Sequence, residues 1–142
     1  MQTSARNQFE GVVAQATAGA VNDEIVIDIA GGQQIVATVT HNSAARLSLK
    51  AGAKATALVK ATSVIVMVDA DASKVSARNV VQGNVTELTK GAVNADLTIT
   101  ANNGVAVSAI ITNTSVDRLG LAVGKPAAAM FKASSVIVGI EG

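Results

Sequence analysis

The sequence contains no cysteine, tryptophan or tyrosine, and it has only two phenylalanines, one proline and one histidine in 142 residues. Without cysteine, neither a disulfide framework nor a thiolate metal site is available. Charged residues make up only 15% of the chain, and the formal net charge is +1, with lysines and arginines scattered among acids. The charge pattern therefore offers no basic patch for a nucleic-acid backbone.

The sequence also lacks a long uninterrupted apolar segment. A transmembrane helix needs about 18 or more consecutive apolar residues, and charged or turn residues break every such stretch here. Apolar residues still form 49% of the chain. A small monomer cannot bury this much apolar surface, so the composition indicates a permanent oligomer. The first motif begins at Ser4, which leaves no room for a signal peptide. We therefore expect a cytoplasmic protein with no membrane contact.

What the chain does have is an internal repeat. Three segments recur at a common offset of about 72 residues, without a gap. They are Ser-Ala-Arg-Asn (4–7 and 76–79), Gly-Ala-Val-Asn (19–22 and 91–94) and Lys-Ala-Thr/Ser-Ser-Val-Ile-Val (60–66 and 132–138). The chain is therefore a tandem duplication, predicted as one domain over residues 1–70, a linker over 71–75 and a second domain over 76–142. Units of about 70 residues are marginally stable alone, so we expect the two units to pack against and stabilise each other.

Each half contains short β-rich runs in which apolar and polar residues alternate. In the first half, the runs 25–29 and 35–39 flank Gly31 and Gly32, which predicts a hairpin. In the second half, the runs 97–101 and 105–111 flank an Asn-Asn-Gly turn in the same way. The hairpin is therefore predicted in both repeats.

The sequence period changes after each hairpin. Residues 41–49 and 113–121 carry small polar capping residues and a leucine pair, which predicts one short helix in each half. The segments 55–60 and 64–68, with their repeats, predict either one long bent strand or two short ones. Five strands with a small helix between the third and fourth are typical of an OB-type barrel. We predict an all-β chain of two tandem OB-like five-stranded barrels, each with one short helix.

The residues that most enzymes use are absent or unpaired. The single histidine, His41, has Asn113 at its repeat position, so a polar loop residue is favoured over a catalytic triad. Asp69 and Glu141 recur as carboxylates, but they lie at the ends of the units and do not suggest an acid–base pair. The glycines lie in hairpins rather than in a phosphate-binding loop. We predict no enzyme, no catalytic residue, no cofactor and no side chain that coordinates a metal directly.

The OB layout raises nucleic-acid binding as an alternative. Single-strand binders of this fold stack bases on aromatic side chains. Phe9 and Phe131 are the only aromatic residues, and valines Val81 and Val59 occupy their repeat positions. A nucleic-acid partner is therefore not expected.

The polar residues that recur are mainly hydrogen-bond donors. In the first half they form three clusters: Ser4, Arg6 and Asn7; Thr40, Ser43 and Arg46; and Lys60 with Thr62 and Ser63. The matching donors in the second half are Ser76, Arg78, Asn79, Thr112, Ser115, Arg118 and Lys132. A donor set without carboxylates suits a small oxyanion. A purely structural role is the alternative, since strand entries, helix caps and solvated strand positions use the same residue types.

Four motifs, in order and in both halves, resemble those of the molybdate-binding Mop domain. They are Ser-Ala-Arg-Asn, Gly-Ala-Val-Asn, Thr-x-x-Ser-x-x-Arg-Leu (40–47 and 112–119) and Lys-Ala-Ser/Thr. The likeness covers the chain almost end to end, so the chain resembles a di-Mop molbindin, a family of cytoplasmic molybdate- and tungstate-binding proteins. Similar pairs occur in molybdate-responsive regulators and in transporter ATPases, but this sequence carries no winged-helix or Walker segment. We therefore expect a free-standing binding protein.

The resemblance implies a homotrimer that binds oxyanions between its subunits. Its interface sites would take a serine, an alanine amide and an arginine from one unit, and a threonine, serine, arginine and lysine from a neighbouring unit. The implied residues are Ser4, Ala5, Arg6, Thr40, Ser43, Arg46, Lys60, Ser76, Ala77, Arg78, Thr112, Ser115, Arg118 and Lys132. A second kind of site, on the trimer axis, is implied at Val21, Asn22, Val93 and Asn94. There the alternative is a structural asparagine in a turn.

The function that these expectations support is reversible, non-catalytic storage and buffering of molybdate or tungstate. The metal would enter only as an oxyanion held by N–H, O–H and cationic groups. An anion-sensing module that binds another protein and a nucleic-acid-binding OB pair are the alternatives.

Overall fold

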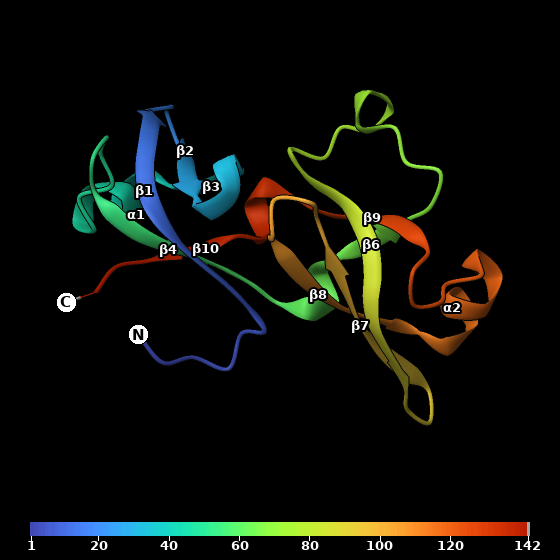
Figure 1. The fold of residues 1–142 in the computed structure, drawn as a ribbon. Coiled ribbons are helices and arrows are strands. Elements are labelled where there is room, and N and C mark those ends of the chain that lie inside the picture. The colour runs from blue at the N-terminus through green and yellow to red at the C-terminus, as the bar shows by residue number, and fades with distance from the viewer. Residues whose placement is uncertain (142) are drawn as a thin grey trace.

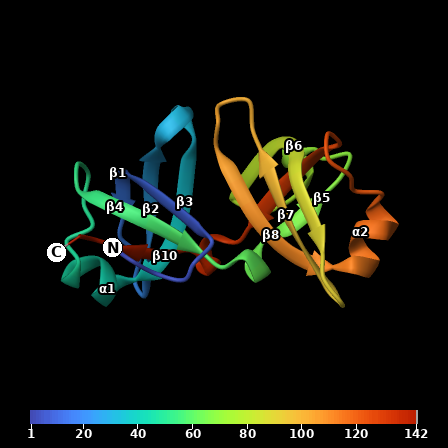
Figure 2. The same ribbon diagram turned by 60° about the horizontal axis from the view of Figure 1, so that its bottom comes forward.

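The computed structural model describes residues 1–141 and shows two five-stranded antiparallel sheets, one at each end of an elongated molecule (Figures 1 and 2). The first half contributes β1 (Asn7–Thr17), β2 (Asn22–Ile29), β3 (Gln34–Thr40), β4 (Lys54–Val59) and β5 (Ile65–Met67). The second half contributes β6 (Asn79–Lys90), β7 (Asn94–Thr100), β8 (Ala106–Thr112), β9 (Pro126–Phe131) and β10 (Ile137–Gly139). The predicted all-β class with two five-stranded units is confirmed.

Both predicted hairpins are present. In β2 and β3, Ile27 pairs with Ile35, and in β7 and β8 the equivalent Ile99 pairs with Val107. All four of these side chains are fully buried. The alternating residues therefore turn one face of each hairpin into the core, as the period of two requires.

One short helix follows each hairpin: α1 (His41–Arg46) and α2 (Asn113–Leu119). The backbone turns into the left-handed region just after each helix, at Ser48 (φ 54°) and Gly120 (φ 63°). Both helices therefore end before the predicted segments 41–49 and 113–121 do. The two predicted helices are confirmed. In the part of the chain that the structure describes, no helix has the length and apolar character of a membrane span.

The last strand of each half joins the sheet of the other half. Turns at Ala61–Ser63 and Ala133–Ser135 separate β4 from β5 and β9 from β10, so each final segment forms two short strands rather than a long bent one. The strand orders are β10-β4-β1-β2-β3 and β5-β9-β6-β7-β8. The repeat does not reveal this exchange, because β5 and β10 occupy equivalent positions in it. The limits 1–70 and 76–142 stay a prediction for the extent of the repeated units.

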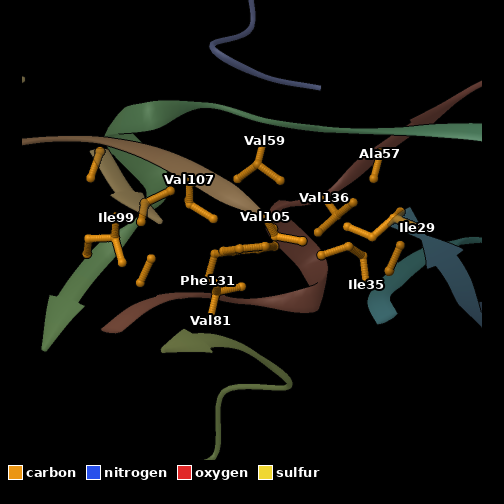
Figure 3. Packing of buried hydrophobic residues seen from close by; sticks show 14 of the residues in the cluster. Ile29, Ile35, Ala57, Val59, Val81, Ile99, Val105, Val107, Phe131 and Val136 are labelled. Atoms are coloured by element: carbon orange, nitrogen blue, oxygen red, sulfur yellow. The ribbon is translucent and has the colours of Figure 1, made fainter. Parts of the chain in front are cut away.

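The hydrophobic core runs without interruption through both halves. Val136, which follows the second turn, lies beside Ile29 and Ile35 of the first half, and Val105 and Phe131 continue the row (Figure 3). Burying an aliphatic or phenylalanine side chain contributes about 1.5–3 kcal/mol. Because these residues come from both repeats, we expect the two halves to unfold together.

A close backbone contact in β6 makes Gly83 sensitive to substitution. A Cβ at this position would lie 2.2 Å from the carbonyl oxygen of Thr100 on β7. We expect Gly83→Ala to lower the free energy of unfolding by about 1–3 kcal/mol, because the strands must separate to admit the methyl group. Urea denaturation measures this loss, with Asn84→Ala at the next, exposed position as control. Equal stability of the Gly83→Ala variant and the unmodified chain would contradict the contact.

Candidate functional site

A cavity of about 570 Å³ lies where the start of β6 meets the end of β9; we refer to it as the Arg78 pocket. It is lined by Thr38, Ile65, Val75, Ser76, Ala77, Arg78, Met130, Phe131, Lys132, Ala133 and Ser134. The donors Ser76, Arg78 and Lys132 come from the second half, whereas Thr38 of β3 and Ile65 of β5 come from the first. The cavity therefore combines a serine, a guanidinium and an ammonium group of the second half with side chains from both repeats.

The first half has a matching cavity of about 420 Å³, the Arg6 pocket. It is lined by Thr3, Ser4, Ala5, Arg6, Leu58, Lys60, Ala61, Thr62, Ile110 and Ile137. Ser4, Arg6 and Lys60 occupy the repeat positions of Ser76, Arg78 and Lys132, and here the apolar wall includes Ile110 of β8 and Ile137 of β10. The duplication thus produces two equivalent pockets, each built by both halves.

The structure brings together one part of the predicted interface set and leaves the other part elsewhere. Each pocket holds the serine, alanine and arginine of one repeat together with the lysine of the same repeat, whereas the resemblance implies a lysine from a neighbouring unit. The threonine, serine and arginine of the helix motif line neither pocket; they are Thr40, Ser43, Arg46, Thr112, Ser115 and Arg118. Neither pocket of the single chain therefore combines both parts, and a site that joins them between subunits is what the resemblance implies. That assembly stays a prediction.

Thr40 and Thr112 are the N-caps of α1 and α2. Each hydroxyl oxygen accepts the backbone N–H of the serine three residues later, Ser43 or Ser115, at 3.1 Å. This bond satisfies one of the unpaired N–H groups at the start of a helix. The helix-cap interpretation is therefore confirmed in the single chain, and it leaves the arginine of the motif, Arg46 or Arg118, exposed in the last turn.

The predicted axial residues lie beside the helix starts rather than in the pockets. The carbonyl of Val21 accepts the N–H of His41 at 3.0 Å, and Asn22 pairs with Thr40 across β2 and β3. Val93 and Asn94 have the same relation to Asn113 and Thr112 at the second helix. The valine side chains are 74% and 70% exposed. Each repeat therefore presents two separate polar regions, one at the pocket and one at the turn and helix cap.

Both pocket arginines already hold carboxylates from the other half of the chain. Arg78 donates two hydrogen bonds to Glu24 on β2, at 2.8 and 3.0 Å. Arg6 donates to Asp96 on β7, at 3.1 and 3.5 Å. The bonds from Arg78 hold the pKa of the Glu24 carboxyl below its ordinary value, and Glu24 in turn raises the pKa of Arg78. The predicted donor set contained no carboxylate, whereas in the structure the arginine of each pocket is paired with one.

Glu24 and Asp96 were not identified from the sequence, although they occupy the same position in the two repeats. The signal that reveals them is the same offset of about 72 residues that reveals the donors. Recurring carboxylates were expected only at Asp69 and Glu141. The structure shows that the recurring pair with polar partners in the pockets is Glu24 and Asp96.

The asparagine of the first motif is buried and does not point into a pocket. Asn79 donates to the carbonyl of Val36 and accepts the N–H of Val36, both at 2.8 Å. Asn7 forms the same pair of bonds with Ser108, at 2.9 and 2.8 Å. Val36 and Ser108 lie on β3 and β8, the terminal strands of the two sheets. Asn7 and Asn79, two of the recurring donors, therefore use their amides to join the two halves, as the structural alternative for this motif allows.

His41 begins α1 and pairs with an acid, rather than lying in a loop as predicted. Its Nδ1 lies 3.0 Å from a carboxylate oxygen of Asp23, which is only 6% exposed. The hydrogen bond with His41 lowers the pKa of Asp23. The second repeat has Ala95 and Asn113 at these positions, so the pair is not repeated.

Within residues 1–141, no three His, Cys, Asp or Glu side chains are grouped to hold a metal ion.

Comparison with known proteins identifies both repeats. The TOBE domain family matches residues 3–66 and 75–138. The molybdenum transport protein ModE of Herbaspirillum seropedicae is 42% identical over 99% of this chain and 52% of its own length. The molybdenum-pterin-binding protein MopA of Rhodobacter capsulatus is 40% identical over 97% of this chain and 52% of its own length. The chain thus spans about half the length of these curated relatives.

A solved structure agrees with the whole fold. The cytoplasmic molybdate-binding protein ModG, in a crystal form with molybdate bound, superposes with a TM-score of 0.94 at 42% sequence identity. The match covers 99% of this chain and 100% of that one. The likeness therefore includes both sheets and their arrangement.

Proposed function

Because this chain belongs to the TOBE domain family and carries two such domains in tandem, we propose that it binds molybdate or tungstate reversibly for storage and buffering in the cytoplasm, without catalysis. The observation that carries the proposal is the pair of equivalent pockets, each with a serine, an arginine and a lysine of one repeat. The close likeness to ModG, whose crystal form holds molybdate, supports this ligand.

The pocket donors suit a tetrahedral dianion. A serine hydroxyl, the backbone N–H of the following alanine, a guanidinium and an ammonium group can all donate hydrogen bonds to the ligand's oxygens. Partial exclusion of water strengthens such charge-assisted bonds. Ile65 and Met130 in the Arg78 pocket, and Ile137 and Leu58 in the Arg6 pocket, provide that exclusion on one side.

We further propose that the complete sites form between subunits of a homotrimer. In this arrangement the exposed Arg46 and Arg118, with their helix caps, face the pockets of a neighbouring subunit. The axial sites lie at Val21, Asn22, Val93 and Asn94. Support comes from the exposure of large apolar side chains: Val21, Val93 and Val123 are 65% to 74% exposed. Contact between subunits would remove these side chains from water.

Calorimetry of the purified chain with sodium molybdate, sodium tungstate and sodium sulfate tests the ligand. We expect saturable heat with molybdate and tungstate at micromolar concentration and weaker binding of sulfate, which has the same charge and shape and differs from the other two anions mainly in its smaller size. Native mass spectrometry with and without molybdate then reports the subunit number and the anion number together. No heat with either molybdate or tungstate at that concentration would lead us to abandon the proposal.

An anion-sensing module that binds another protein is the second candidate. It is favoured by one observation: the ModE relative is about twice as long as this chain, so the same tandem pair occurs within a larger protein there. A partner that is retained on the immobilised chain only in the presence of molybdate would support it. Nucleic-acid binding has less support, because Phe131 is 1% exposed and Phe9 packs against the core.

A further inference from the structure

Glu24 and Asp96 lie at the edges of the two pockets. Glu24 pairs across β2 and β3 with Thr38, which lines the Arg78 pocket, and Asp96 pairs across β7 and β8 with Ile110, which lines the Arg6 pocket. From these positions each carboxylate reaches the arginine of the other repeat. The same arrangement therefore occurs at both pockets.

A carboxylate and an oxyanion compete for the same guanidinium. The guanidinium presents its N–H donors in a planar fork that binds a carboxylate or a tetrahedral oxyanion through two parallel bonds. In the Arg78 pocket both bonds go to Glu24. An oxyanion that binds this fork has to displace the carboxylate or accept it as a like-charged neighbour.

The ion pairs have little structural value by themselves. The side chains of Arg78 and Glu24 are 53% and 39% exposed, and those of Arg6 and Asp96 are 51% and 50% exposed. Pairs exposed to this degree contribute little to folding stability. Their recurrence in both repeats is therefore better explained by an effect on the pockets.

We propose that Glu24 and Asp96 are internal competitors of the oxyanion that set the affinity of the two pockets. The inference rests on the proposed function, since it concerns the same sites. The two pockets are not equal, because Asp96 is one methylene shorter than Glu24 and its bonds to Arg6, at 3.1 and 3.5 Å, are longer than those between Glu24 and Arg78. The Arg6 pocket consequently binds an oxyanion more tightly than the Arg78 pocket.

Calorimetry with sodium molybdate at constant ionic strength tests this inference on single pockets. In a Lys60→Ala background, which weakens the Arg6 pocket, Glu24→Gln should tighten binding at the Arg78 pocket by about two- to fivefold. In a Lys132→Ala background, Asp96→Asn should tighten the Arg6 pocket to a smaller extent. Charge-retaining exchanges separate competition from charge alone: Glu24→Asp should tighten binding, and Asp96→Glu should weaken it.

Asp28→Asn is the matched control. It removes the same charge from β2, but its carboxylate accepts a hydrogen bond from Gln34 and lines neither pocket. It should leave the molybdate affinity within experimental error. Unchanged or weaker binding by Glu24→Gln overturns the inference, and weaker binding would mean that the carboxylate holds Arg78 in place for the ligand. Absence of heat from the unmodified chain and every variant overturns the proposed function itself, and with it the inference.

Discussion

Replacement of Asn79 by alanine is expected to lower the free energy of unfolding by about 2–5 kcal/mol. The side chain is 1% exposed and satisfies both the N–H and the C=O of Val36 on β3. Without the amide, these two backbone groups lose their partner inside the protein, and each buried unsatisfied group costs about 1–3 kcal/mol. Thermal and urea denaturation followed by circular dichroism measure the loss.

Two further variants make this result specific. Asn79→Asp keeps the size of the side chain but replaces the Nδ2 donor with a second oxygen, so it should destabilise the chain at neutral pH at least as much as alanine. Asn84→Ala removes an exposed asparagine from the same strand and should change stability by less than about 0.5 kcal/mol. If Asn79→Ala and Asn84→Ala were equally stable, the amide would not join the two halves.

The second large effect is expected at the pocket lysines. Lys132→Ala should weaken molybdate binding at the Arg78 pocket by about ten- to a hundredfold, since a hydrogen bond to a charged group contributes about 1.5–3 kcal/mol. Lys60→Ala should do the same at the Arg6 pocket. Each variant should keep the remaining sites at their original affinity, which calorimetry resolves as a smaller number of tight sites per chain.

Lys50→Ala is the control for this experiment. Lys50 is exposed, lies after α1 and lines neither pocket, so its loss changes the net charge without touching the sites. A uniform loss of affinity at all sites in Lys60→Ala or Lys132→Ala would contradict two classes of site. A loss as large in Lys50→Ala would indicate that only the overall charge matters.

Local patterns predicted the strands and helices well. The period-two runs at Ile25–Ile29 and Ile35–Val39 specify which face of the hairpin is buried, and Thr40 and Ser43 specify where a helix begins. These features depend on residues that are close in sequence. They can therefore be predicted without knowing the tertiary structure.

The arrangement of the last strands could not be predicted in this way. Ile65 and Ile137 have equivalent surroundings in sequence, so β5 and β10 fit either sheet equally well by pattern. The short turns that precede them, at Ala61–Ser63 and Ala133–Ser135, are equivalent as well. The choice depends on packing between segments that lie far apart in the chain.

The candidate site was predicted in part for a related reason. The repeat identified Arg78 and Lys132 as recurring donors, and the structure places them in one cavity. It did not show that Asn79 faces inward or that Glu24 holds Arg78, because both facts depend on contacts between the two repeats. Residue types indicate what chemistry is available, whereas the partners of each residue depend on the fold.

The strand exchange also has a consequence for how the protein is made. The sheet of the first half contains β10, which follows all the other strands of the second half in the chain. A ribosome releases the chain from its amino end, and domains usually fold as they emerge. Here the first sheet cannot be completed until the second half has been synthesised, because its fifth strand comes after β6, β7, β8 and β9 in the chain. The first sheet therefore stays four-stranded until β10 has emerged, and it is completed after the sheet of the second half.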